Sequence, residues 1–225
     1  MDALLRGRHL FAAAMTFVAA GWIGGSAQAQ MPIPGYPPRA EDFDAREIAM
    51  LPRYCIYTQM FRDKVPGGND PAMISQWYDY MGPIYHDMHH YCLGLMKANR
   101  GQVLARDPEA RRFYIGDSIT EFEYVIRKAE DSFVLLPEML TKKGESLVLL
   151  GKGPLGALQF ERAIEVKNDY WPAYAQLSDY HKAAGDIKKA RQVLETGLAR
   201  VPDAKGLQRR LSELDAGTSR GGAKR

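Results

Sequence analysis

The sequence predicts an all-α protein, a short α-solenoid of paired helices preceded by an N-terminal helical elaboration. Two observations favour this fold class. The segment 171–204 has an earlier copy of its residue pattern, at a period of about 34 residues, which is typical of stacked helix pairs. Upstream, helix starts are marked at Asp70-Pro71 and Asp107-Pro108, because aspartate caps free amides and proline fits the first helical position.

The internal repeat is a series of matching residue classes. When the chain is shifted by this period, six pairs align: Gly144 with Ser178, Gly151 with Gly185, Gly156 with Ala190, Phe160 with Leu194, Ala163 with Gly197 and Ile164 with Leu198. Small residues recur where two helices would touch, a large apolar residue recurs on the facing side, and a glycine recurs at the break between helices. We therefore expect two helix pairs in equivalent register between residues 137 and 204.

Residues 171–204, WPAYAQLSDYHKAAGDIKKARQVLETGLARVPDA, resemble one complete tetratricopeptide repeat, and the resemblance covers 137–204 and, more weakly, 118–214. It implies antiparallel helix pairs in a right-handed superhelix, in which the first helix of each pair lines a concave groove. Matched position by position, the implied groove residues are Glu138, Thr141, Glu145, Val148 and Leu149 in one repeat and Pro172, Ala175, Asp179, Lys182 and Ala183 in the next.

Some positions depart from the family pattern. Lys143 stands where the family usually has leucine, and Asn168 replaces the usual proline. The lysine and asparagine clamp by which some relatives hold a C-terminal carboxylate is absent, since Ala175 and Asp179 occupy the matching places. The resemblance therefore implies a protein-binding scaffold, but argues against one that holds chaperone tails.

The first 29 residues have the features of a signal peptide. Arg6 and Arg8 give a positive start, a mostly apolar run extends from Leu10 to Ile23, and small residues end the segment at Ala29. This run is too short for a membrane span, because a helix needs about 20 apolar residues to cross a bilayer. We therefore expect cleavage near Ala29, with an uncleaved anchor as the alternative. The expected location is the bacterial periplasm, with no transmembrane segment in the mature chain.

Residues 30–52 contain five prolines, a composition that predicts an extended tether. A short helix is expected at the end of this segment, from Asp44 to Leu51. Residues 53–116 follow as an N-terminal helical region that contains both cysteines of the chain, Cys55 and Cys92. Export would place them in an oxidising compartment, which favours a Cys55–Cys92 disulfide. Two buried free thiols, or two thiolate ligands to a metal, are the alternatives.

Three histidines, His86, His89 and His90, precede Cys92 in a helix expected from Pro83 to Asn99. Residues three and four apart share a helix face, so His86 could bind zinc or copper together with His89 or His90. A remote third ligand is not evident, because only two other histidines occur in the chain. The competing interpretation is that His90 packs against a neighbour while the other two bond to carbonyls or tyrosines. The aromatic residues just before them, Trp77 to Tyr85, are interpreted as packing.

Residues 117–214 are expected to form the solenoid and its capping helix. Ser118 and Glu121 have the spacing of a capping box, so residues 116–117 are predicted to separate two helices. Ile126 and Ala129 lie one repeat period before Phe160 and Ala163, which extends the repeat register to the helix that ends near residue 129.

The C-terminal segment is expected to close the stack. Leu207, Leu211 and Leu214 lie on one stripe of a helix, and such a polar-backed helix is what the open end of a solenoid requires. Residues 215–225 are expected to be a disordered basic tail.

The composition excludes some classes of function. The formal net charge is +3, and the aromatic residues are not interleaved with basic runs, which argues against a nucleic-acid partner. The chain contains neither an H-E-x-x-H motif nor a P-loop of the form G-x-x-x-x-G-K-[ST], and we expect neither enzymatic activity nor a cofactor. A Cys92–His90 nucleophile pair is a weaker enzymatic alternative, because residues two apart face different sides of a helix.

We therefore expect a periplasmic scaffold that binds a protein or peptide partner of the cell envelope through its groove. The alternative is a metal- or haem-linked redox or metal-delivery protein that uses His86, His89 and His90. A c-type haem would require C-x-x-C-H, which does not occur in the chain.

Overall fold

The computed structural model describes residues 43–222, and all regular elements of this range are helical. They are α1 (Ala45–Ala49), η1 (Arg53–Tyr57), α2 (Pro71–Met81), η2 (Pro83–Asp87), α3 (Met88–Asn99), η3 (Arg100–Leu104), α4 (Pro108–Ile126), α5 (Leu136–Leu149), α6 (Gly153–Val166), α7 (Trp171–Ala183), α8 (Ile187–Arg200) and α9 (Lys205–Gly222). The predicted signal peptide with its cleavage site, most of the predicted tether and the last three residues lie outside the described range.

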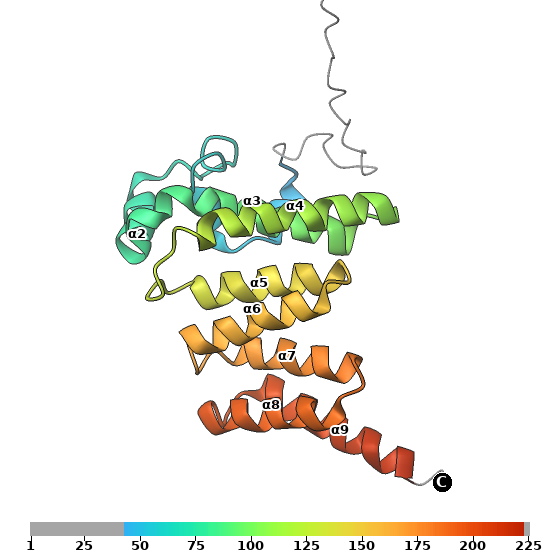
Figure 1. The fold of residues 1–225 in the computed structure, drawn as a ribbon. Coiled ribbons are helices and arrows are strands. Elements are labelled where there is room, and N and C mark those ends of the chain that lie inside the picture. The colour runs from blue at the N-terminus through green and yellow to red at the C-terminus, as the bar shows by residue number, and fades with distance from the viewer. Residues whose placement is uncertain (1–42, 223–225) are drawn as a thin grey trace, which may run out of the picture.

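The helices stack as successive antiparallel pairs, α3 with α4, α5 with α6 and α7 with α8, and α9 closes the stack (Figure 1). Each pair packs on its neighbours, as in a solenoid. One core joins α3, α4 and the start of α5 through residues such as Tyr91, Phe122 and Met139. A second core joins α7, α8 and α9 around Leu194 and Leu207. The predicted fold class, an all-α solenoid with an N-terminal elaboration, is confirmed.

The repeat register of the two central pairs is confirmed by their contacts. In the first pair, a Cβ added to Gly144 would lie 2.4 Å from the Phe160 ring and 3.0 Å from the carbonyl oxygen of Gly156. In the second pair, the equivalent Ser178 donates a hydrogen bond of 2.9 Å to the carbonyl oxygen of Ala190. Small residues thus bring the backbones of each pair into contact, as the repeat pattern predicted.

The helices α3 and α4 form an earlier pair of the same kind, but at another spacing. A Cβ on Gly94 would lie 2.5 Å from the Phe122 ring, the relationship that Gly144 has with Phe160. The step along the chain from Phe122 to Phe160 is longer than the repeat period, so the predicted alignment of Ile126 with Phe160 is wrong. The connection from α4 to α5 takes residues 127–135, and it is this connection that breaks the period.

The predicted break at residues 116–117 is also wrong, because α4 runs unbroken for 19 residues. Ser118 is in the middle of this helix and bonds back to the carbonyl oxygen of Ile115 at 2.7 Å, a common arrangement for a helical serine. Its hydroxyl also lies 3.0 Å from the Ser146 hydroxyl on α5. The capping-box spacing at Ser118 and Glu121 therefore marks no helix start, and the predicted boundary between regions falls inside one helix.

Residues 43–52, the described end of the predicted tether, are folded rather than extended. Asp44 caps α1 through a capping box with Glu47, so the short helix expected between Asp44 and Leu51 is confirmed. Glu47 is buried and pairs with Arg100 at the end of α3. A tertiary contact thus folds this end of the predicted tether onto the body.

The stack ends at α9, as predicted. Leu207 and Leu214 are buried against the preceding pair, and the Arg210 side chain bonds to Asp179 on α7 at 2.9 Å. The helix then continues to Gly222, so the prediction of a disordered tail is wrong for residues 215–222. Within the described range, no helix has both the length and the apolar character that a membrane span requires.

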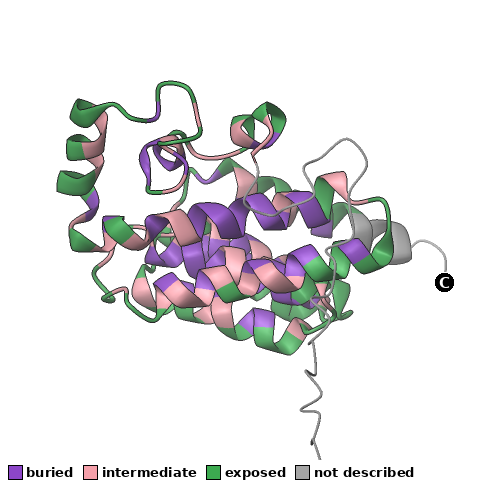
Figure 2. Ribbon diagram, turned by 90° about the horizontal axis from the view of Figure 1, so that it is seen from above, coloured by how far each residue is buried: buried purple, intermediate pink, exposed green. Residues whose placement is uncertain are grey.

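The elaboration leaves one helix at the side of the stack. Figure 2 shows that α2 stands at one end of the molecule with an outward side that is almost entirely exposed. Asp70 caps α2 through the amides of Ala72 and Met73, as predicted. The helix ends at Gly82, whose φ of 71° favours glycine. Its contacts are with η1 and η2, so α2 forms a ledge beside the stack.

Candidate binding surface

A disulfide joins Cys55 of η1 to Cys92 of α3, with a sulfur–sulfur distance of 2.07 Å and a Cα–Cα distance of 5.6 Å. The predicted pairing is confirmed, and neither cysteine is a free thiol or a metal ligand. The bond holds the neighbouring Tyr54 against the core shared with Tyr91 and Met139. It therefore fixes η1 to the first helix pair.

Two of the predicted groove residues do not line any surface. Thr141 is buried, and its hydroxyl donates a hydrogen bond of 2.8 Å to the carbonyl oxygen of Pro137. Ala175 is buried in the core with Ala190 and Leu194. At both positions a small side chain faces an adjacent helix, so the prediction that Thr141 and Ala175 contact a partner is wrong.

The other predicted groove residues keep some exposure, but most have a partner within the chain. Glu145 accepts a hydrogen bond from Lys142 at 2.9 Å, and Asp179 accepts one from Arg210 at 2.9 Å. Glu138 accepts one from the Tyr91 hydroxyl at 2.7 Å. Lys182 is exposed. Two of the three carboxylates thus lie beside a lysine or arginine of this chain, whereas no lysine, arginine or histidine of the described range lies within ion-pair distance of Glu138.

Glu138 is partly buried near three tyrosines. Its negative charge raises the pKa of Tyr54, Tyr91 and Tyr170, in each case as a smaller contribution than burial. Tyr54 comes from η1, Tyr91 from α3, and Tyr170 immediately precedes α7. The carboxylate therefore lies where the N-terminal elaboration meets the first helices of three successive pairs.

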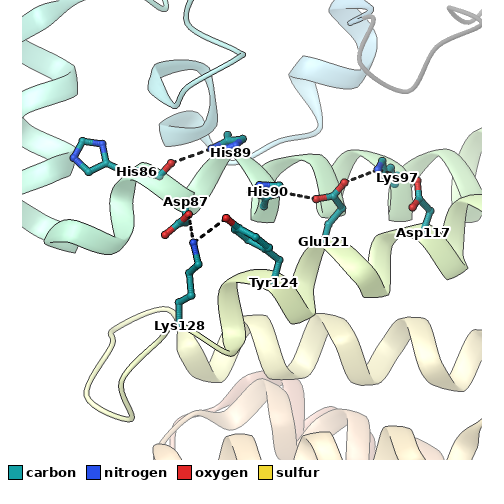
Figure 3. Close-up of polar contacts among 9 residues, drawn as sticks. All are labelled: His86, Asp87, His89, His90, Lys97, Asp117, Glu121, Tyr124 and Lys128. Carbon is teal, nitrogen blue, oxygen red and sulfur yellow. Dashed lines mark hydrogen bonds and ion pairs between the residues drawn. The ribbon is translucent and has the colours of Figure 1, made fainter.

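Figure 3 shows that the three histidines do not converge. The His89 Nδ1 atom lies 3.0 Å from the carbonyl oxygen of His86, and the His90 Nδ1 atom lies 2.6 Å from a Glu121 oxygen. The His90 ring also packs on Tyr124, at 3.9 Å between ring centroids. Within residues 43–216, no group of three or more histidine, cysteine, aspartate or glutamate side chains is arranged to hold a metal ion. The rings of His89 and His90 lie 4.3 Å apart, but the three histidines make different hydrogen bonds and do not form a shared ligand set among the described residues.

The histidines adjoin a network that ties α3 to α4. Lys97 is buried and lies 2.8 Å from Asp117 and 2.6 Å from Glu121. Burial opposes ionisation of Glu121, but its hydrogen bonds with Lys97 and His90 outweigh burial and lower its pKa. Nearby, Lys128 bonds to Asp87 at 2.7 Å and to the Tyr124 hydroxyl at 2.8 Å (Figure 3). These polar groups are used in packing the first helix pair.

Two adjoining hollows lie beside the ledge formed by α2. An aromatic recess of about 480 Å³ is lined by Tyr54, Gln76, Trp77, Tyr80, Met81 and Leu135. A second recess of about 500 Å³ shares Tyr80 and Met81 with it and extends to the Asp87–Lys128 pair. The rings of Tyr54 and Trp77 lie 5.5 Å apart, and those of Trp77 and Tyr80 lie 6.0 Å apart.

The sequence interpretation of these aromatic residues as packing was incomplete. Tyr80 is 58% exposed, and Tyr78 is 38% exposed. The Tyr54 Oη and Trp77 Nε1 atoms are buried but have no hydrogen-bond partner in the described part of the chain. The cluster of tryptophan and tyrosine on the predicted helix after Asp70 was the sequence feature that could have indicated the recess. The sequence did not show which of these rings face the recess, because that depends on where η1 and residue 135 lie.

Comparison with known proteins identified no matching family model and no matching curated protein. Among solved structures, the chain is similar to the first TPR of Spaghetti (RPAP3) bound to HSP90 peptide SRMEEVD, with a TM-score of 0.42 and 13% sequence identity. The match covers 56% of this chain and 95% of that chain. By its own helix arrangement, the protein is an all-α solenoid of antiparallel helix pairs.

Proposed function

We propose that this protein is a non-enzymatic scaffold of the bacterial periplasm that binds a protein or peptide partner. The observation on which the proposal depends is the aromatic recess beside α2, where Trp77, Tyr80 and Met81 line a hollow of about 480 Å³. Tryptophan, tyrosine and methionine are enriched in the centres of protein interfaces. The recess lies beside a stack of helices, an architecture that supplies extended binding surfaces.

Several side chains that could serve catalysis have structural roles instead. Cys92 is in the disulfide, and His90 is held by Glu121. The nucleophile pair considered from the sequence is therefore not formed. The proposed location rests on the signal-peptide features of residues 1–29.

The location is tested by intact mass measurement of the protein recovered from the periplasm of its host. We expect a mature chain whose first residue is Gln30. A chain that begins at Met1 would contradict cleavage, and recovery from the cytoplasm alone would contradict export.

The binding function is tested by a photo-crosslinking amino acid placed in the recess. Replacing Tyr80, which is 58% exposed, should give a discrete crosslinked species in cells, identifiable by mass spectrometry. The matched control is the same replacement at Lys188, which is exposed on α8 and remote from α2 (Figure 1). Equal crosslinking at both positions, or none at Tyr80, would refute the recess as a binding surface.

A further inference from the structure

Three carboxylates at predicted groove positions, Glu138, Glu145 and Asp179, differ in their neighbours. Glu145 lies beside Lys142, and Asp179 lies beside Arg210. For Glu138, the recorded polar contact is the neutral hydroxyl of Tyr91, and no cation of the described residues reaches it. Glu138 is partly exposed, so its charge is accessible to an incoming group. A carboxylate in this position attracts a cation at short range.

The surroundings of Glu138 suit a particular kind of cation. Leu135, the residue directly before α5, is three positions from Glu138 in the sequence. Leu135 and Tyr54 both line the aromatic recess. Glu138 is not among the residues that line the recess, but it bonds to Tyr91, which shares a core with Tyr54. Burial, and then the charge of Glu138, raises the pKa of Tyr54, so the carboxylate lies near the Tyr54 side of the recess. Lysine and arginine side chains would suit an apolar recess near a carboxylate, because each has a charged group at the end of a long apolar stem.

Tyr54 gives a second and independent indication. The residue is only 8% exposed, and its Oη atom is buried without a hydrogen-bond partner in the described part of the chain. Buried hydroxyls are normally hydrogen-bonded. A guanidinium or ammonium group that entered beside Glu138 would donate to the tyrosine oxygen as well as to the carboxylate. The rings of Trp77 and Tyr80 would add cation–π attraction along the stem.

We propose that the aromatic recess and Glu138 together bind a lysine or arginine side chain from a basic segment of the partner. The aliphatic stem lies against Tyr54, Trp77 and Tyr80, and the charged head bonds to Glu138. This inference rests on the proposed function and specifies the chemistry of the partner. Charge complementarity selects the occupant, because an acidic or neutral side chain would leave Glu138 without a counter-charge.

The test uses the mature chain from residue 30 and two small probes, N-acetyl-arginine methylamide and its uncharged isostere N-acetyl-citrulline methylamide. The readout is the indole N–H resonance of Trp77, which the variant Trp171→Phe distinguishes from that of Trp171. The arginine probe should shift the Trp77 signal, and the citrulline probe should bind at least tenfold more weakly. Equal binding of the two probes would overturn the proposal, and this comparison needs no substitution in the recess.

Two variants sharpen the test. Glu138→Gln keeps an oxygen that can accept from Tyr91, so the fold should persist while arginine binding weakens at least tenfold. Glu123→Gln is the matched control, because that carboxylate lies 3.1 Å from Lys143 and outside the recess. Unchanged binding by Glu138→Gln, or an equal loss in both variants, would overturn the proposal.

A third arm tests whether this chain supplies the cation. Arg39 lies between the predicted cleavage site and the described residues, so a chain that begins at residue 43 lacks it. If the chain from residue 30 and the chain from residue 43 bind the arginine probe equally, the cation comes from an external partner. Binding that appears only in the shorter chain would assign the recess to Arg39 and overturn the proposal. If Tyr80 still captures a partner while the probe tests fail, this inference fails and the proposed function stands.

Discussion

Glu47 and Arg100, which are 53 residues apart in the sequence, form a fully buried ion pair that fastens α1 to the end of α3. The Arg100 Nη2 atom donates to a Glu47 oxygen at 2.8 Å, and Arg100 also lies over the Tyr114 ring at 5.6 Å. Both side chains are completely shielded from solvent. Since isolated buried charges are very unfavourable, each residue requires the other, and the pair fixes the start of the described chain.

Removal of one partner should therefore destabilise the protein strongly. We expect Glu47→Ala to lower the free energy of unfolding by about 3–5 kcal/mol, because it leaves a buried cation without its counter-charge. The measurement is urea unfolding followed by circular dichroism. The control is the double change Glu47→Leu with Arg100→Met, which should recover much of the loss. A Glu47→Ala midpoint equal to that of the unchanged protein would contradict the buried pair.

Loss of the Cys55–Cys92 bond should also destabilise the protein. The bond closes a loop with a sequence separation of 37, for which the chain-entropy model gives a stabilisation of about 4 kcal/mol. Cys55→Ser with Cys92→Ser should lower the melting temperature, and the oxidised protein should show no thiol reactive to a labelling reagent after denaturation. Two reactive thiols in the unreduced protein would disprove the bond.

A substitution at the contact between α7 and α8 should lower the free energy of unfolding more than substitutions of exposed side chains do. Ala190 is fully buried, and its carbonyl oxygen accepts from Ser178 at 2.9 Å. Ala190→Leu should reduce the free energy of unfolding by about 1–3 kcal/mol through overpacking. The comparison is the simultaneous neutralisation of Glu145, Asp179 and Lys182. The partly exposed ion pairs of Glu145 with Lys142 and of Asp179 with Arg210 are each worth about 0–1 kcal/mol, and Lys182 is exposed. A larger loss from the triple change than from Ala190→Leu would contradict the register.

His181 should make stability depend on pH near neutrality. It is 7% exposed, its Nε2 atom has no hydrogen-bond partner among the described residues, and burial followed by the charge of Lys189 lowers its pKa. The native state therefore binds fewer protons than the unfolded state below pH 6.5, the ordinary value for histidine, so stability is complete above that pH and falls as the medium is acidified.

The variant His181→Phe should remove this part of the pH dependence. We expect its urea midpoint to change less between pH 7.5 and pH 5.5 than that of the unchanged protein, although His89, whose pKa is also lowered by burial and by His90, still contributes. At pH 5.5 the variant should be the more stable protein. An identical change in midpoint for the two proteins would show that His181 does not titrate differently on unfolding.

The sequence alone determined the two central helix pairs and the main points at which their helices touch. The pattern that aligns Gly144 with Ser178 and Gly156 with Ala190 predicted contacts that the structure has, because helix packing depends on the size of a few periodic residues. The helix caps at Asp70 and Asp107 could also be predicted from the sequence, because each aspartate accepts hydrogen bonds from backbone amides no more than three residues away. The disulfide followed from the presence of two cysteines in a chain predicted to be exported.

Only the tertiary structure decided which polar side chains are paired within the protein and which could contact another molecule. The pairs Glu47–Arg100 and His90–Glu121 join residues 53 and 31 positions apart, and Asp179 meets Arg210 across 31 positions. No local pattern encodes such partners, because they depend on how whole helices are placed. The same placement buried Thr141 and Ala175 and left Glu138 with no lysine, arginine or histidine of the described residues within ion-pair distance. Thus the two central helix pairs could be predicted from periodic residues, whereas the aromatic recess combines segments that are distant in the sequence.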